Sequence, residues 1–198
     1  MAVLPDKDAL DACRRCPLWA KATQAVGGEG NRKAALLLIG EQPGDQEDLK
    51  GQPFVGPAGR LLRELLAAAG IARGDYYLTN AVKHFKWEPR GTRRIHKTPA
   101  QKEVDACRVW LDAEIAAVGP AVIVTLGATA LAAVLGKRAG IAMSRGRTLR
   151  HPSGAAIVAT YHPSALLRAP TREDMTRLRD AFADDIARAR TLGFEHAT

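Results

Sequence analysis

Four short apolar runs in this 198-residue chain each end next to a polar residue or a glycine that could take part in chemistry. The first run, 35–39, leads into Glu41 and Gln42, and an acidic segment rich in glycine and proline follows. A carboxylate and an amide at the exit of a buried strand face the ligand crevice in many α/β proteins. The plainer alternative is a turn in which these side chains only cap the next helix.

The other apolar runs end in residues of complementary chemistry. Asn80 follows the second run, Gly127 the third and His162 the fourth. Because the carboxyl ends of parallel strands lie at one edge of a sheet, we expect these residues and Glu41 to line one crevice. The amide of Asn80 can donate to a carbonyl and accept from a ring N–H, a pattern that selects uracil over cytosine.

The sequence His162-Pro163-Ser164 fixes the backbone direction at the histidine, since proline restricts the residue before it. An imidazole held there can donate to negative charge on a leaving group. The alternative is a histidine that is satisfied within the core. Phe54 is likewise either a core residue or a platform on which a base stacks.

His96 ends the basic sequence Arg93-Arg94-Ile95-His96. One interpretation is a loop that contacts phosphate. The other is catalytic, because an imidazole held over a crevice among cations has a lowered pKa and remains neutral and nucleophilic. Glu41 is the carboxylate that could orient it. The residues alone leave both interpretations open.

Three cysteines and a histidine could hold a metal. Cys13 and Cys16 are spaced to bind one metal from a single turn. Cys107 falls on an expected helix that could close over them, and His84 is the candidate fourth ligand. Zinc and an iron–sulfur cluster both accept such ligands. Alternatively, Cys107 is a small core residue and the other pair is incidental.

The bulk composition limits the class of protein. A net charge of +8 and a pI of about 9.8 favour a polyanionic partner over a neutral metabolite. The chain shows no apolar leader and no apolar run long enough for a membrane span, so we expect a cytoplasmic protein. Three cysteines in a reducing compartment favour metal or redox chemistry over disulfides. The length predicts a single domain over residues 1–198.

Hydrophobic periodicity predicts strands that alternate with helices. Strands are expected at 35–39, 76–82, 121–126 and 155–160. Helices are expected from Pro57 to Gly70, from a Thr98 N-cap to Gly119, from about 127 to 136, and from about Thr171 onwards. Residues 85–97 are expected to form a basic loop. This order predicts an α/β fold of three layers, α/β/α, with a central, mostly parallel twisted sheet.

Four segments, in order, resemble motifs of the uracil-DNA glycosylase superfamily and of its iron–sulfur family 4 branch. They are Gly40-Glu-Gln-Pro-Gly44, Pro53-Phe-Val-Gly-Pro-Ala-Gly59, Thr79-Asn-Ala-Val-Lys-His84 and His162-Pro-Ser164. The loop at 93–96 is further similar to the UdgX subgroup, whose loop histidine attacks the sugar and stays covalently attached to DNA. In that subgroup the loop begins with lysine where this chain has Thr92, which we expect to alter a phosphate or backbone contact more than the chemistry.

The resemblance implies a [4Fe–4S] cluster of structural importance at the DNA-facing surface. Its ligands would be Cys13, Cys16, His84 and Cys107, with histidine where ordinary family 4 enzymes have cysteine. The implied partner is uracil-containing DNA, with single strands preferred because flipping out a base then costs least. No membrane partner is expected, and the protein is expected to be a monomer.

The resemblance also implies roles for the crevice residues in binding. Uracil would stack on Phe54 and be recognised by Asn80 and by the backbone near Gln42, with Gly40 and Asp45 as further substrate contacts. The phosphate contacts would be Arg93, Arg94, Ser164 and Arg168.

For catalysis, the resemblance implies that His162 stabilises the departing uracil anion. His96, oriented by Glu41, would capture C1′ of the sugar, so that the protein acts once. One alternative is an ordinary multiple-turnover family 4 enzyme in which the His96 loop only contacts phosphate. Another is an iron–sulfur module that binds DNA without catalysis.

Overall fold

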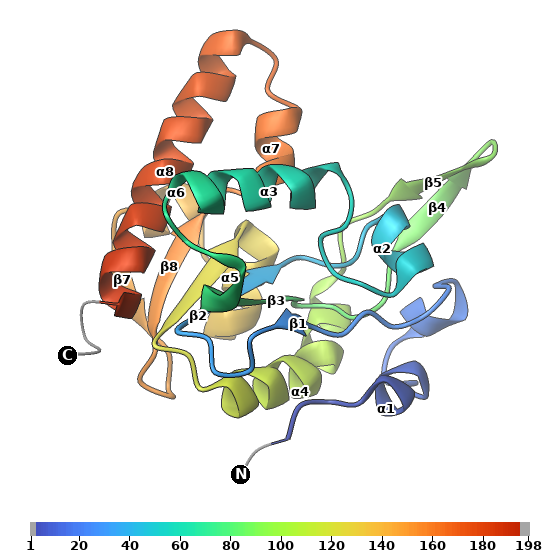
Figure 1. Cartoon of the computed structure of the whole chain (residues 1–198). Coiled ribbons are helices and arrows are strands. Elements are labelled where there is room, and N and C mark those ends of the chain that lie inside the picture. Colours follow the sequence, from blue (N-terminus) through green and yellow to red (C-terminus); the bar gives the residue numbers. More distant parts are fainter. Residues whose placement is uncertain (1–2, 195–198) are drawn as a thin grey trace.

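The computed structural model describes residues 3–194 of the 198-residue chain. Its centre is a six-stranded sheet in the order β1-β3-β2-β6-β8-β7, with helices on both faces (Figure 1). None of the helices in this range is long and apolar enough to cross a membrane.

The four central strands are parallel and lie where the apolar runs predict them. They are β2 (Leu36–Gly40), β3 (Tyr76–Asn80), β6 (Val122–Leu126) and β8 (Ala156–Thr160), and all their residues are buried. The sequence does not predict the two antiparallel edge strands, β1 (Glu29–Gly30) and β7 (Thr148–Arg150), which are too short to show a periodicity. The prediction of an α/β fold with a mostly parallel sheet is confirmed.

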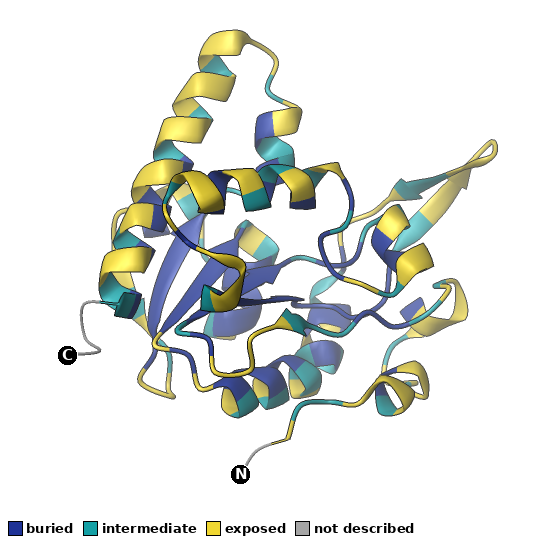
Figure 2. Cartoon of the chain, viewed as in Figure 1, coloured by how far each residue is buried: buried dark blue, intermediate teal, exposed yellow. Residues whose placement is uncertain are grey.

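Helices cover the two faces of the sheet and make it the middle layer of three. One face carries α4 (Gln101–Val118) and α5 (Ala128–Leu135), and the other carries α3 (Pro57–Ala68), α7 (Pro163–Leu167) and α8 (Arg172–Phe194). Strand side chains alternate between the two cores, so that Leu37 and Ile39 lie under α4 while Leu36 and Leu38 lie under α3. Figure 2 shows these helices with buried inner and exposed outer faces.

The remaining helical elements are short. They are α1 (Lys7–Asp11), η1 (Pro17–Ala20), α2 (Asp45–Lys50), η2 (Arg73–Asp75) and α6 (Ile141–Ser144). Cys13 and Cys16 lie between α1 and η1, and α2 directly follows the exit of β2.

Helix α4 begins later than the sequence predicts. The expected N-cap was Thr98, but the structure places the cap at Ala100. Oε2 of Glu103 accepts a hydrogen bond from the Ala100 N–H at 2.6 Å and pairs with Lys86 at 2.8 Å. These charge-assisted contacts outweigh a threonine hydroxyl cap. At the other end, Gly119 ends the helix with φ of 59°, as predicted.

Residues 85–97 form a β-hairpin, so the prediction of a loop was wrong. β4 (Trp87–Arg90) and β5 (Arg93–His96) pair antiparallel around a turn at Gly91 and Thr92. Gly91 has φ of 59°, a conformation that two-residue hairpin turns require and glycine adopts without strain. The hairpin projects from the body of the protein beside α2 (Figure 1).

Candidate active site at the carboxyl ends of the parallel strands

The central strands open at their carboxyl ends into one crevice of about 510 Å³. The strand exits contribute Glu41, Gln42, Asn80, Gly127 and His162, which the sequence predicts to meet. Neighbouring segments add further lining residues, including Gly44, Asp45, Phe54, Pro57, His96, Ser164 and Arg168.

Gly40, Phe54 and Asn80 meet at the crevice. A Cβ atom on Gly40 would lie 2.4 Å from Oδ1 of Asn80 and 2.6 Å from Cζ of Phe54, so only glycine fits. Phe54 has a left-handed φ of 57°, a strained conformation that persists where the surroundings enforce it and is common at functional sites. The result is an aromatic ring beside a carboxamide, which suits a planar ligand with a hydrogen-bonding edge.

His96 faces Glu41 in this crevice. Nε2 of the imidazole lies 3.4 Å from Oε1 of Glu41, and 47% of the His96 side chain is exposed. Burial of the ring lowers the pKa of His96, Glu41 opposes this effect, and Arg168 adds to it. The imidazole is therefore neutral at pH 7, and one of its nitrogens carries no proton.

Thr129 is a residue of the site that the sequence analysis does not identify. Its Oγ1 donates to Oε2 of Glu41 at 2.5 Å, and the opposite oxygen, Oε1, faces His96. The available signal was its place in the first turn of α5, just after the strand exit at Gly127. Thr129 thus holds the carboxylate in the orientation that His96 meets.

His162 is oriented by the first turn of α7. Its Nδ1 accepts from the backbone N–H of Ser164 at 3.1 Å, and Ser164 Oγ accepts from Nη2 of Arg168 at 3.1 Å. Burial, and to a smaller extent the charges of Arg168 and His96, lowers the pKa of His162 to about 4. A neutral ring that accepts at Nδ1 carries its proton on Nε2. His162 therefore offers an N–H donor at neutral pH.

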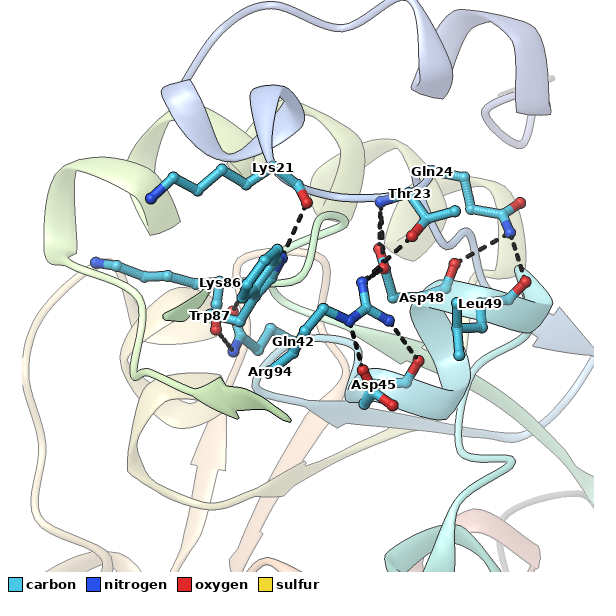
Figure 3. Close-up of polar contacts among 10 residues, drawn as sticks. All are labelled: Lys21, Thr23, Gln24, Gln42, Asp45, Asp48, Leu49, Lys86, Trp87 and Arg94. Atoms are coloured by element: carbon cyan, nitrogen blue, oxygen red, sulfur yellow. Dashed lines mark hydrogen bonds and ion pairs between the residues drawn. The ribbon is translucent and has the colours of Figure 1, made fainter. Parts of the chain in front are cut away.

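Arg94 anchors the hairpin that carries His96 (Figure 3). Its Nε donates to Oδ1 of Asp45 and its Nη1 to Oδ2 of Asp48, both at 2.6 Å. Asp48 is fully buried and 19% of the Arg94 side chain is exposed, so the second pair is largely sheltered from solvent. Asp48 also accepts from the backbone N–H of Thr23 at 2.9 Å. These contacts connect β5 to α2 and to the N-terminal segment, residues 3–28, which precedes β1.

The structure gives Arg94 and Asp45 a role that the sequence does not predict. We expect Arg94 at a phosphate and Asp45 at the substrate, yet the two side chains pair with each other. They are 49 residues apart, and nothing in a single sequence indicates that contact. Arg93, whose side chain points to the other face of β5, is exposed and accessible to a phosphate.

Gln42 closes the base of the hairpin (Figure 3). Its Oε1 accepts from the N–H of Lys86 at 3.0 Å, and its Nε2 donates to the carbonyls of Lys86 and Lys97 at 3.2 and 3.1 Å. Beside it, Nε1 of Trp87 donates to the carbonyl of Lys21 at 2.9 Å. Because its carboxamide is used in these bonds, Gln42 can offer a ligand its backbone rather than its side chain.

The predicted thiol ligands join the N-terminal segment to α4. Sγ of Cys13 accepts from Nε1 of Trp110 at 3.3 Å, and Sγ of Cys107 accepts from the N–H of Lys83 at 3.2 Å. Burial raises the pKa of Cys107 to about 11, with smaller contributions from Cys16 and Cys13 and an opposing effect of Lys83. Within residues 3–194, no three His, Cys, Asp or Glu side chains form a group that could hold a metal ion.

His84, the fourth predicted ligand, follows β3 and is 5% exposed. Burial lowers the pKa of His84, while Asp11 and Asp48 oppose the lowering. A neutral imidazole keeps one nitrogen available to a metal.

Comparison with known proteins identifies the family. Residues 28–187 match the family model described as "Uracil DNA glycosylase superfamily". A type-4 uracil-DNA glycosylase from Thermotoga maritima is 42% identical over 181 residues, which are 91% of this chain and 88% of that protein. Type-4 uracil-DNA glycosylases from Pyrobaculum aerophilum and Archaeoglobus fulgidus are 38% and 36% identical, each over 88% of this chain and over 86% and 84% of their own lengths.

The family match covers all six strands of the central sheet and all the crevice residues described above. A match of this extent, supported by relatives that align over most of both chains, does not depend on any single motif. The protein therefore belongs to the uracil-DNA glycosylase superfamily.

Proposed function

We propose that this protein excises uracil from DNA and then remains covalently attached to the deoxyribose through His96, as in the UdgX subgroup. Its similarity to uracil-DNA glycosylases supports excision. The observation that carries the proposal of capture is the 3.4 Å approach of His96 to Glu41, in the crevice that Asn80 and Phe54 also line. Because the protein stays on its product, each molecule acts once.

Uracil binds beside Gly40 with its ring against Phe54. Nδ2 of Asn80 donates to a ring carbonyl, and Oδ1 accepts from the ring N–H. Cytosine presents the reverse pattern and would leave buried donors and acceptors unpaired, which is costly.

Bond cleavage leaves the electron pair of the C1′–N1 bond on uracil and makes the sugar oxocarbenium-like. The Nε2–H of His162 donates to the negative charge that develops on a uracil carbonyl. A pKa of about 4 keeps His162 neutral, so it acts as a hydrogen-bond donor and transfers no proton. Solvent protonates the released uracil anion.

His96 then supplies the electron pair of a new N–C1′ bond. The attacking ring is neutral because burial lowers its pKa. Attack makes the ring cationic, and the adjacent Glu41, held by Thr129, stabilises that charge. Loss of the remaining ring proton to solvent leaves a neutral imidazole bonded to the sugar.

The protein's charge suits a DNA strand. The net charge is +8, and Arg93 on the hairpin and Ser164 and Arg168 at the crevice are the proposed phosphate contacts. We expect a preference for single-stranded DNA, in which flipping a base costs least, and we expect the protein to act as a monomer.

An ordinary multiple-turnover uracil-DNA glycosylase is the second candidate. The type-4 relatives favour it, and Glu41 could orient a water molecule in place of His96. The products would then be free uracil and an abasic site, and the hairpin would serve to contact phosphate.

We also propose that Cys13, Cys16, His84 and Cys107 hold a [4Fe–4S] cluster. Thiolates and imidazole are suitable ligands for iron–sulfur centres. Burial raises the pKa of Cys107 and of Cys16, which makes their ionisation costly, and binding to iron would offset that cost. When bound, the cluster would stabilise the junction of the N-terminal segment with α4.

A denaturing gel tests the proposed function. Protein mixed with a single-stranded uracil oligonucleotide should give a slower band that survives denaturation, and a thymine oligonucleotide should give none. His96→Ala should abolish the band, because the attacking nitrogen is lost. His151→Ala, at a histidine hydrogen-bonded to Ser153 outside the crevice, should retain it. Alkali-sensitive DNA without the band would favour the second candidate.

The rate of band formation should depend on pH through His96. Neutral His96 is the reactive form, so the rate should be constant at alkaline pH and fall as the pH drops through the lowered pKa of His96. Glu41→Gln removes the charge that opposes the lowering, so its acid limb should move to lower pH. Its plateau should fall about a hundredfold because orientation is lost. An unmoved acid limb in Glu41→Gln would contradict the assigned role of Glu41.

Arg94→Lys should reduce capture more than excision. Lysine keeps a positive charge near Asp48 but cannot form both hydrogen bonds of the guanidinium, so the hairpin loosens around His96. We expect about a tenfold slower formation of the covalent band, with uracil release changed less than about twofold. Arg90→Lys, at an exposed position of the same hairpin, is the control. Equal losses of capture and release would show that Arg94 does not act through His96.

The cluster proposal is tested by colour and iron content. Protein purified without air should be brown, with broad visible absorption and the iron of one cluster. Cys107→Ala and His84→Ala should lose most of this iron, whereas His151→Ala should keep it. A colourless wild-type protein with one bound zinc would contradict the proposal.

A further inference from the structure

Lys83 and Glu114 form a buried ion pair that the proposed chemistry does not use. Nζ of Lys83 lies 2.6 Å from Oε2 of Glu114, and each side chain is 1% exposed. Two charges are costly to remove from water, and their attraction offsets that cost only if their remaining hydrogen-bonding groups are satisfied. The partners of this pair therefore show what it holds in place.

Every N–H of the Lys83 ammonium has a partner. It donates to Glu114 at 2.6 Å, to Oγ1 of Thr79 at 2.7 Å and to the backbone carbonyl of Asn80 at 2.7 Å. Thr79 in turn donates to Glu114 at 2.7 Å, and the other oxygen of Glu114 accepts from the N–H of Gly28 at 3.0 Å. The network is closed, and one of its members is the backbone of the residue proposed to recognise uracil.

The exit of β2 holds the same segment from another direction. The N–H of Ala81 donates to the carbonyl of Gly40 at 2.9 Å, and the N–H of Val82 donates to the carbonyl of Glu41 at 3.0 Å. The peptide that joins Asn80 to Ala81 is thus bonded at its carbonyl by Lys83 and at its N–H by Gly40. Because both groups of this peptide are hydrogen-bonded, the backbone of Asn80 is fixed, and its carboxamide is held next to Gly40.

Helix α4 is the base for this arrangement. Glu114 and Cys107 are seven residues apart, which is about two turns, and so lie on one face of α4. Cys107 accepts from the backbone N–H of Lys83 at 3.2 Å while Glu114 pairs with its ammonium. The helix therefore holds Lys83 at both its backbone and its side chain.

We propose that Lys83 and Glu114 are positioning residues that set the place of Asn80 and so control the recognition of uracil. The contacts of residues 79–83 are observed in the structure, whereas the role of Asn80 in recognising uracil rests on the proposed function. If the pair only stabilised the fold, apolar side chains could replace it without slowing uracil excision, because such replacements often preserve stability. If the pair positions Asn80, the same replacement should slow excision, since the Asn80 carbonyl would lose its hydrogen bond from Lys83.

The test compares wild-type protein with K83M/E114L, alone and combined with Asn80→Ala. Single-turnover uracil excision should slow about tenfold when the pair is replaced in the wild-type background and less than about twofold in the Asn80→Ala background, because the pair acts through Asn80. Amide hydrogen exchange should become faster at Ala81 and Val82, while the amides of β6 keep their protection. Equal slowing in both backgrounds, or unchanged exchange at Ala81 and Val82, would overturn the proposal.

A second pair of variants covers the case in which K83M/E114L does not fold. Thr79→Val removes one of the three ammonium partners and should speed exchange at Ala81 and Val82, whereas Thr79→Ser keeps the hydroxyl and should restore slow exchange. Unchanged exchange in Thr79→Val would count against the proposal. Failure of wild-type protein to release uracil would overturn the proposed function alone, because the exchange measurement tests the positioning separately.

Discussion

The complete burial of the four central strands is the constraint on which the site depends. Every residue of β2, β3, β6 and β8 is buried, so no side chain along the length of these strands can reach a ligand. Polar groups can meet a substrate only where the strands end. Glu41, Asn80 and His162 occupy those exits, within two residues of the last residue of their strands. The crevice is thus a consequence of the parallel sheet and not of any one loop.

The two sides of the crevice that carry Asn80 and His96 are held by different contacts. The backbone of Asn80 is held by Lys83, whose ion pair with Glu114 is almost completely buried. His96 is held by the hairpin, which the Arg94–Asp45 pair and the hydrogen bonds of Gln42 attach to the residues that follow β2. Buried contacts resist local opening more than partly exposed ones. The side of the crevice formed by Asn80 is therefore the more rigid one, and the hairpin is the side that can adjust more easily.

The sequence predicts the parts of this protein that depend on local patterns. Four apolar runs were enough to predict the four central strands, and glycines at 119 and 136 were enough to end two helices. The hairpin was missed because its basic residues obscure the strand alternation and its only turn signal is Gly91. The pairing of Arg94 with Asp45 and the contact of Thr129 with Glu41 were missed for a different reason. Both join residues 49 or more apart, and one sequence carries no record of which distant side chains meet.

The environment of each histidine determines which hydrogen-bonding group its ring presents in the crevice. Both rings have a lowered pKa, so charge does not distinguish them at neutral pH. His162 accepts at Nδ1 from the backbone of Ser164, which leaves only an N–H donor for a ligand. The ring of His96 meets a carboxylate at one nitrogen, so a proton there is stabilised and the electron pair on the other nitrogen remains available. Ser164 and Glu41 therefore determine which face of each histidine is available to a ligand.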